Sequence, residues 1–104
     1  MTAASAAFIY KICTQAEWDQ AVKAGVFLGS ALDIRDGFIH FSGISQMQKT
    51  AEKHFVGIEN LILVEVAVSA LNSATLKWEV SREGERFPHL YAPLEIKKVN
   101  QSWA

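Results

Sequence analysis

The segment Leu61–Val68 constrains the fold more than any other part of the sequence. It reads LILVEVAV, a run of aliphatic residues that only Glu65 interrupts. A run without clean alternation of polar and apolar residues is typical of a strand covered on both faces. It falls far short of the ~20 residues that a membrane-spanning helix needs. We therefore expect a globular domain, with no membrane insertion, built around this strand at the centre of a sheet.

Length, charge and cysteine content describe one small domain. The chain has 104 residues, half of them hydrophobic, with ten basic and eleven acidic side chains. That length suffices for one continuous core, so we expect a tail at residues 1–7 and a single domain at residues 8–104. The balanced charge excludes proteins that hold nucleic acid by bulk positive charge. Cys13 is the only cysteine, and we expect it to be a packed thiol. A single cysteine cannot form a disulfide within the chain, and we expect no signal peptide. The sequence therefore favours the cytoplasm.

Helix caps and turn formers divide the chain into its expected elements. Thr14 with Glu17, and Ser45 with Gln48, have the spacing of capping boxes. The irregular pattern of residues 26–35 predicts a surface loop. We expect helices at residues 14–24 and 45–56, strands at residues 8–13, 38–42, 61–68, 76–80, 87–91 and 94–99, and a polar tail after them.

Residues 76–91 are expected to form a hairpin around Gly84. Two registers are open: one places Trp78 opposite His89, and the other places Glu79 opposite His89. Because Pro88 has no amide hydrogen to donate, the second strand is expected to be short, at an edge, or bent.

Three histidines are the first candidates for function. Alternation along residues 38–42 places His40 on one face with Phe38 and Ser42. His89 lies in the second hairpin strand, and His54 lies near the buried edge of the second helix, where it either packs or points toward strand 38–42. The alternative for each is a hydrogen-bonded structural histidine. Their spacings match no metal-binding motif, and we expect no metal.

Charged side chains of the hairpin are the next candidates. Glu79 either directs its carboxylate into a cleft or pairs with a neighbouring cation in solvent. Arg82 and Arg86 either grip an anion or serve solubility. Ser42 with His40 lacks the third member of a nucleophilic triad, which disfavours a serine hydrolase.

The pattern of the whole chain resembles the bacterial domain-of-unknown-function family 952. The most specific blocks are Asp36–Ser42 and Phe87–Tyr91, and the others are Ile9–Ile12, Glu17–Trp18, Gly29–Ser30, Thr50–Ala51, His54–Phe55, Leu76–Glu79 and Ser81–Arg82. The resemblance implies an α+β fold of the ADP-ribosyltransferase type, a small split antiparallel sheet with two main helices and a cleft between its halves. It implies no established activity. The order of elements is also similar to that of the nicotinamide-dependent RNA 2′-phosphotransferases.

The residue types and the fold resemblance together motivate three hypotheses for function. The first is an enzyme that uses NAD for ADP-ribosyl transfer or a related phosphotransfer, with catalytic residues His40, Glu79 and His89 and cofactor-binding residues Tyr10, Ser42, Trp78, Arg82 and Tyr91. In this hypothesis Glu79 stabilises an oxocarbenium-like cation, while His40 and Ser42 position the ribose and Arg82 holds phosphates. The second is a non-catalytic module that binds a nucleotide or another small polar ligand. The third is a structural or partner-binding protein, in which these side chains have no catalytic or ligand-binding role. None of the three hypotheses indicates an oligomeric state.

The chain departs from the related transferases at two places. Tyr10 and Lys11 stand where many of them have His or Arg on the first strand, and Glu83-Gly84 replaces the Gly-Gly usual in the family after Ser-Arg. The balanced charge argues against the RNA-repair version of the activity.

Overall fold

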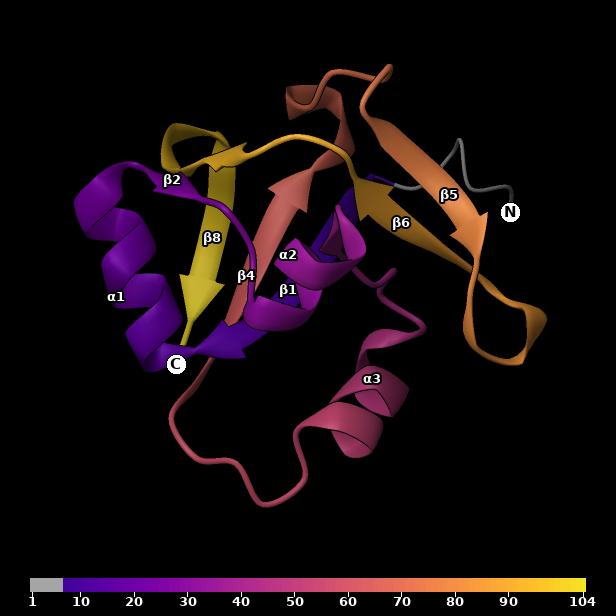
Figure 1. Ribbon diagram of the computed structural model, residues 1–104, viewed down its shortest axis with the longest axis horizontal. Helices are drawn as coiled ribbons and strands as arrows, with labels where there is room; N and C mark the ends of the chain where they lie inside the picture. Colours follow the sequence, from indigo (N-terminus) through magenta and orange to yellow (C-terminus); the bar gives the residue numbers. More distant parts are fainter. Residues whose placement is uncertain (1–6) are drawn as a thin grey trace.

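The computed structural model of the protein describes residues 7–104, except for the side chain of Arg82, and shows an α+β fold (Figure 1). The expected tail at residues 1–7 lies outside the described residues except for Ala7. The strands are β1 (Phe8–Thr14), β2 (Val26–Phe27), β3 (Ile39–His40), β4 (Leu61–Ala67), β5 (Leu76–Val80), β6 (Arg86–Leu90), β7 (Leu94–Glu95) and β8 (Val99–Trp103). The helices are α1 (Gln15–Ala24), α2 (Ala31–Asp36) and α3 (Met47–His54), and short 3₁₀ turns span Val68–Ala70, Arg82–Gly84 and Ile96–Lys98.

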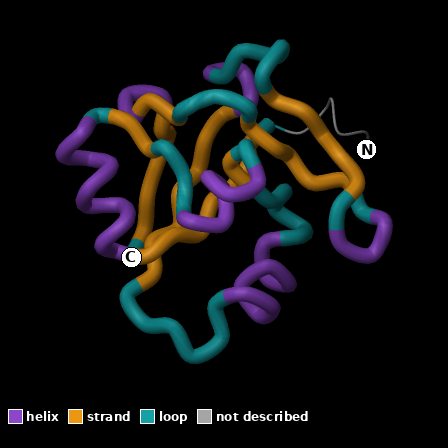
Figure 2. Tube along the Cα trace, in the orientation of Figure 1, coloured by secondary structure: helices purple, strands orange, loops and turns teal. Residues whose placement is uncertain are grey.

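The strands form three small antiparallel sheets. One has the order β1-β4-β8, a second has the order β3-β6-β5, and β2 pairs with β7 in a third. The predicted central place of residues 61–68 is confirmed, because β4 pairs with β1 on one side and β8 on the other. The expected cover on both faces differs, because burial along β4 alternates: Ile62, Val64 and Val66 are buried and the residues between them are half-buried. In Figure 2 the β5–β6 hairpin lies on the opposite side of the molecule from α1.

One bridge joins the two larger sheets. The amides and carbonyls of Tyr10 and Ser42 exchange two hydrogen bonds of 2.8 Å each, which makes an isolated antiparallel bridge between β1 and the residues after β3. The two halves of the fold therefore meet at Tyr10 and Ser42, both of which are candidate ligand-binding residues.

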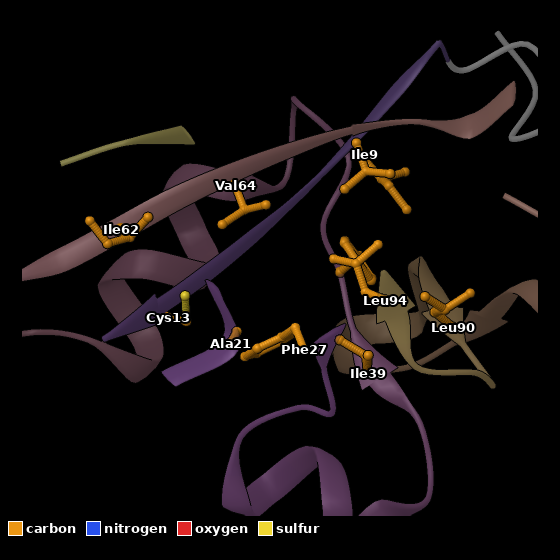
Figure 3. Packing of buried hydrophobic residues seen from close by; sticks show 11 residues of the cluster. Ile9, Cys13, Ala21, Phe27, Ile39, Ile62, Val64, Leu90 and Leu94 are labelled. Atoms are coloured by element: carbon orange, nitrogen blue, oxygen red, sulfur yellow. The ribbon is translucent and has the colours of Figure 1, made fainter. Parts of the chain in front are cut away.

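The hydrophobic core draws residues from β1, α1, β2, the strand around β3, β4, β6 and β7. Ile39 and Phe41 are buried on one face of strand 38–42, as the alternation predicts. Cys13 is also buried, as predicted, and burial followed by the nearby Glu17 carboxylate raises the pKa of its thiol to about 11. The remaining members of the core are Ile9, Ala21, Phe27, Ile62, Val64, Val66, Leu90 and Leu94 (Figure 3).

The two predicted main helices are present, with one cap that differs. The Thr14–Glu17 capping box of α1 forms in both directions, and Gly25 ends the helix in the left-handed conformation. The predicted cap at Ser45 is wrong, because Gln46 is the N-cap of α3 and makes no side-chain cap bond. The Gln46 side chain instead accepts from the Gly43 amide and donates to the Arg86 carbonyl, which ties the start of α3 to β6.

The expectation of a surface loop at residues 26–35, and so of only two main helices, is wrong. This segment contains β2 and the third helix, α2. Ser30 caps α2, since its hydroxyl accepts from the Asp33 amide while the Asp33 carboxylate accepts from the Ser30 amide. Gly37, at φ 86°, ends the helix.

The hairpin at residues 76–91 is confirmed, but both expected registers are wrong. Lys77 lies opposite His89 and Trp78 lies opposite Pro88. The turn is centred on Glu83, because the Ser81 amide donates to the Glu85 carbonyl around Glu83 and Gly84, both at positive φ. β6 is short, as predicted, yet it occupies the centre of its sheet rather than an edge.

The C-terminal segment also differs from expectation. The single strand predicted at residues 94–99 divides into β7 and a 3₁₀ turn, and the expected polar tail forms most of β8. Backbone pairing of β8 with β4 explains this, because it needs no apolar side chains on the solvent face. Among residues 7–104, no helix is long and apolar enough to cross a membrane.

Candidate functional site

A cleft of about 550 Å³ opens beside the junction of the two larger sheets. Its walls come from β1, the first turn of α1, α2, the strand around β3, α3 and the β5–β6 hairpin. The polar side chains that line it are Tyr10, Lys11, Thr14, Glu17, Ser30, Arg35, Asp36, His40, Ser42, Thr50, Lys53, His54, Ser81 and His89. Hydroxyl, imidazole and cationic groups thus outnumber the two carboxylates around this space.

A buried carboxylate supports one wall of the cleft. Asp33 in α2 is 1% exposed, and its Oδ2 atom lies 2.8 Å from the ammonium of Lys11, which is itself buried in β1. Burial by itself raises the pKa of Asp33, but the hydrogen bond from His40 and the charge of Lys11 outweigh burial and hold it well below its usual range. Asp33 is therefore ionised, and it joins α2 to β1.

His40 lies between two carboxylates. Its Nδ1 atom is 2.6 Å from Asp33 Oδ1, and its Nε2 atom is 3.1 Å from Asp36 Oδ2. The His40 amide also donates to Asp33 Oδ1. Because carboxylates only accept hydrogen bonds, both contacts are satisfied together when both ring nitrogens carry protons. Both ring nitrogens of His40 therefore face carboxylates rather than open space in the cleft.

His89 lies directly opposite His40 in the β3–β6 pair. Its Nδ1 atom is 2.9 Å from Glu79 Oε1, and the hydroxyl of Tyr91 donates to the same oxygen over 2.6 Å. The hydrogen bond from Tyr91 and, after it, the bond from His89 lower the pKa of the Glu79 carboxyl. The bond to Glu79 in turn raises the pKa of the Tyr91 hydroxyl. Glu79 reaches His89 diagonally, since its backbone lies opposite Phe87.

Phe38 holds the two imidazoles in place. Its ring stacks on His89 with centroids 4.1 Å apart and packs at a tilt against His40 at 4.5 Å. The two imidazoles meet edge to face at 5.5 Å. Tyr91 also packs at a tilt against Phe38, with centroids 5.1 Å apart, so one aromatic cluster spans β3 and β6.

Hydroxyl groups line the cleft at the sheet junction. Ser42 Oγ and Thr50 Oγ1 are 2.8 Å apart, and Thr50 Oγ1 also donates to the Gln46 carbonyl. The Tyr10 hydroxyl donates to Glu65 over 2.7 Å, and burial followed by this contact raises its pKa. Ser42 is buried except where it borders the cleft, so its hydroxyl is held in a fixed position.

The structure brings four of the eight predicted site residues to this cleft, namely Tyr10, His40, Ser42 and His89. Glu79 does not line the cleft, but it hydrogen-bonds to His89, which does. Trp78 packs against the core, and Tyr91 lines a smaller cavity of about 240 Å³ beside Phe38. The side chain of Arg82 lies outside the described part of the chain.

Sequence reasoning missed the groups that hold His40 and the cations that face the cleft. Asp33 lies in the segment 26–35 expected to be a loop, although Ser30-x-x-Asp33 is a capping-box signal, and Asp36 directly follows that segment. Lys11 also had a signal, because a lysine in an otherwise apolar strand requires a buried partner. Arg35 and Lys53 carried none beyond their charge.

No group of three or more His, Cys, Asp or Glu side chains within residues 7–104 is arranged to hold a metal ion.

Comparison with known proteins gives a family and close structural relatives. The crystal structure of protein CC0527 from Caulobacter crescentus is 51% identical, with a TM-score of 0.89 over 92% of this chain and 83% of that one. Its solution NMR structure, also 51% identical, gives a TM-score of 0.83 over 92% and 82% of the two chains. No curated protein matches the chain. The model of the protein-of-unknown-function family DUF952 matches residues 12–102, and the chain belongs to that family.

Proposed function

We propose that the cleft binds a small anionic ligand of the nucleotide class. The observation that carries this proposal is the lining, in which hydroxyl, imidazole and cationic side chains from five segments surround one space of about 550 Å³. Sites for small molecules typically occupy ~300–1,000 Å³. A phosphate matches the cations, and a sugar matches the hydroxyls.

Two cations are available for a phosphate. The side chain of Arg35 is 72% exposed, and within the described residues its ion pair is with Asp36 through Nε, which leaves the two terminal nitrogens for a ligand. Lys53 is exposed at the end of α3 and makes no ion pair within the same residues. Lys11, by contrast, is already paired with the buried Asp33.

Transfer of ADP-ribose from NAD, on a fold of the ADP-ribosyltransferase type, is the second candidate. The observation in its favour is that His40 and Ser42 border the cleft where two small antiparallel sheets meet beside Tyr10. Glu79 weighs against it, because the expected cation-stabilising carboxylate accepts from His89 and Tyr91 and does not line the cleft. Ligand binding is therefore the first proposal, and transfer is the second.

Calorimetric titration with AMP, ADP-ribose and NAD tests both candidates. We expect saturable binding, and we expect Arg35→Gln and Lys53→Gln each to weaken it about tenfold, the loss of one charge-assisted hydrogen bond. Release of nicotinamide from bound NAD would favour transfer, and binding without release would favour the binding module.

Lys97→Gln is the matched control, because Lys97 is an exposed lysine that pairs with Glu95 and does not line the cleft. It should bind like the wild-type protein. Absence of saturable binding for all three nucleotides, or equal weakening by Lys97→Gln, would contradict the proposal.

A further inference from the structure

The hydrogen bond between His89 and Glu79 fixes the tautomer of His89. Its Nδ1 atom is 2.9 Å from Glu79 Oε1. An ionised carboxylate only accepts, so Nδ1 carries the proton that this bond needs. In the neutral imidazole the other nitrogen, Nε2, then holds the lone pair.

The Nε2 atom of His89 is open to the cleft. Within the described residues, the His89 ring makes one polar contact, which joins its Nδ1 atom to Glu79. In the same part of the chain, no buried side-chain nitrogen or oxygen lacks a hydrogen-bond partner. Nε2 is therefore reached by solvent although the side chain is only 6% exposed, and the cavity that His89 lines is the cleft.

Neighbouring groups hold the ring in this orientation. Phe38 stacks on one face at an interplanar angle of 22°. Glu79 is itself held by the Tyr91 hydroxyl, at 2.6 Å from the oxygen that accepts from His89. Lys77, which lies opposite His89 on β5, directs its ammonium toward the Tyr91 ring, 5.7 Å from the ring centroid. A carboxylate that orients an imidazole in this way also stabilises the imidazolium formed when Nε2 takes up a proton.

His40 provides the contrast within the same site. Both of its ring nitrogens face carboxylate oxygens, of Asp33 and Asp36. Of the two imidazoles that meet between β3 and β6, only that of His89 has a nitrogen available to a molecule in the cleft.

We infer that His89 is the general base of this site, with Glu79 and Tyr91 as positioning residues. This inference rests on the proposed ligand site and adds chemistry to it. Nε2 takes the proton of a water molecule or of a hydroxyl group of the bound nucleotide-class ligand. The O–H bond breaks, an N–H bond forms, the electron pair stays on the oxygen, and the new positive charge lies beside Glu79. The oxygen then attacks a phosphorus atom of the ligand: a new P–O bond forms, the P–O bond to the leaving group breaks, and the leaving oxygen takes the proton from Nε2.

Acylation by diethyl pyrocarbonate tests the inference, because the reagent reacts with a ring nitrogen that holds a lone pair. Trypsin places the three histidines on separate peptides, since Arg35, Lys49, Lys53, Arg86 and Lys97 flank them. Mass spectrometry then gives a rate for each histidine. We expect His89 to react faster than His40 at neutral pH, and saturating ADP-ribose to slow its reaction.

Variants of the positioning residues keep the buried His89 in place. Glu79→Ala removes a side chain that is 39% exposed, and it should slow acylation of His89 about tenfold, the loss of one hydrogen bond to a charged group. Tyr91→Phe keeps the packing on Phe38 and should slow the reaction less. Glu85→Ala, in the exposed loop of the same hairpin, is the control and should leave the rate unchanged.

The outcomes separate the inference from the proposed function. Acylation of His40 ahead of His89, or of exposed His54 with none at His89, would overturn the inference. Acylation of His89 that ADP-ribose does not slow would support the open Nε2 and contradict the ligand site. Nitrogen chemical shifts of labelled protein give a check without reagent, with Nε2 of His89 expected as the lone-pair nitrogen in the wild-type protein and a mixture of tautomers in Glu79→Ala.

Discussion

Asp33 is the buried charge on which three segments of the site converge. It pairs with Lys11 in β1, accepts from the Ser30 amide at the start of α2, and holds His40 in β3. Because these groups are shielded from water, removing the carboxylate leaves the Lys11 ammonium buried without its partner. Asp33 therefore stabilises the fold and the cleft wall together.

We predict that Asp33→Asn, which keeps the shape of the side chain, costs about 3–5 kcal/mol of unfolding free energy. Urea denaturation of the two proteins measures this. Asp36→Asn is the matched control, since Asp36 contacts the same His40 ring but is 30% exposed, and it should cost less. Equal stability of Asp33→Asn and wild type would show that the buried pair contributes nothing.

The same substitution should change the acid dependence of stability. The pKa of Asp33 is lower in the folded than in the unfolded protein. The unfolded chain therefore binds the proton first, so the contribution of Asp33 is complete above its unfolded pKa of about 3.9 and is lost as pH falls below it. Urea midpoints measured across the acid range should fall more steeply for wild type than for Asp33→Asn.

At the scale of single residues, the alternation of side chains along a strand predicts which residues share a face. The shared face of His40 and Ser42 follows from strand geometry, and both residues border the cleft. The Lys11–Asp33 pair could not be derived, because it joins two segments that come together only through tertiary packing.

Helix α2 depends on the conformation of Gly29 immediately before its cap. Gly29 has a φ of 110°, and a Cβ atom there would lie 2.6 Å from the Cβ of Asp33. Only glycine lets the chain enter the helix with Asp33 placed beneath it. The loop before α2 thus determines where the buried carboxylate lies.

We predict that Gly29→Ala destabilises the protein by more than Gly25→Ala. Gly25 also has a positive φ, yet a Cβ atom there meets nothing within 4 Å, so its substitution costs only the backbone term of about 1–2 kcal/mol. Gly29→Ala adds a clash with Asp33, and thermal unfolding of the two variants compares them. A loss for Gly29→Ala no greater than that for Gly25→Ala would contradict this role.

A helix can be predicted from periodicity when its apolar residues face the core. α1 has a cap and a stop, and Trp18 and Ala21 pack in the core although Val22 is exposed, so its prediction is confirmed. In α2, Leu32 and Ile34 are 39% and 66% exposed, so no apolar stripe faces the core and the periodicity fails. The hairpin register depends on Glu83, a non-glycine residue at a φ of 55°, which no turn rule anticipates.

At the scale of the whole molecule, the site lies at the junction of two sheets. The Tyr10–Ser42 bridge brings β1 beside the strand that carries His40, and α2 and α3 close the cleft around it. The sequence predicts the strands, and it places Ser42 on the same face of its strand as His40. Which strand edges meet depends on contacts between residues far apart in the chain, which no local pattern encodes.

The net charge of the chain is nearly balanced, but two of its exposed cations line the cleft. The whole chain has a formal charge of −1, yet Arg35 and Lys53 lie together at one cleft. This distribution suits a small anion held at one place rather than a long polyanion, which would need a basic face.

Titration of ¹⁵N-labelled protein with ADP-ribose, followed by amide chemical shifts, tests the central claim that this cleft is the ligand site. We predict saturable shifts that concentrate on the amides of Arg35, His40, Ser42 and Lys53, with the amides of β8 unchanged. Saturable shifts that map to β8 or to the cavity beside Tyr91, or no saturable shifts at all, would contradict the account.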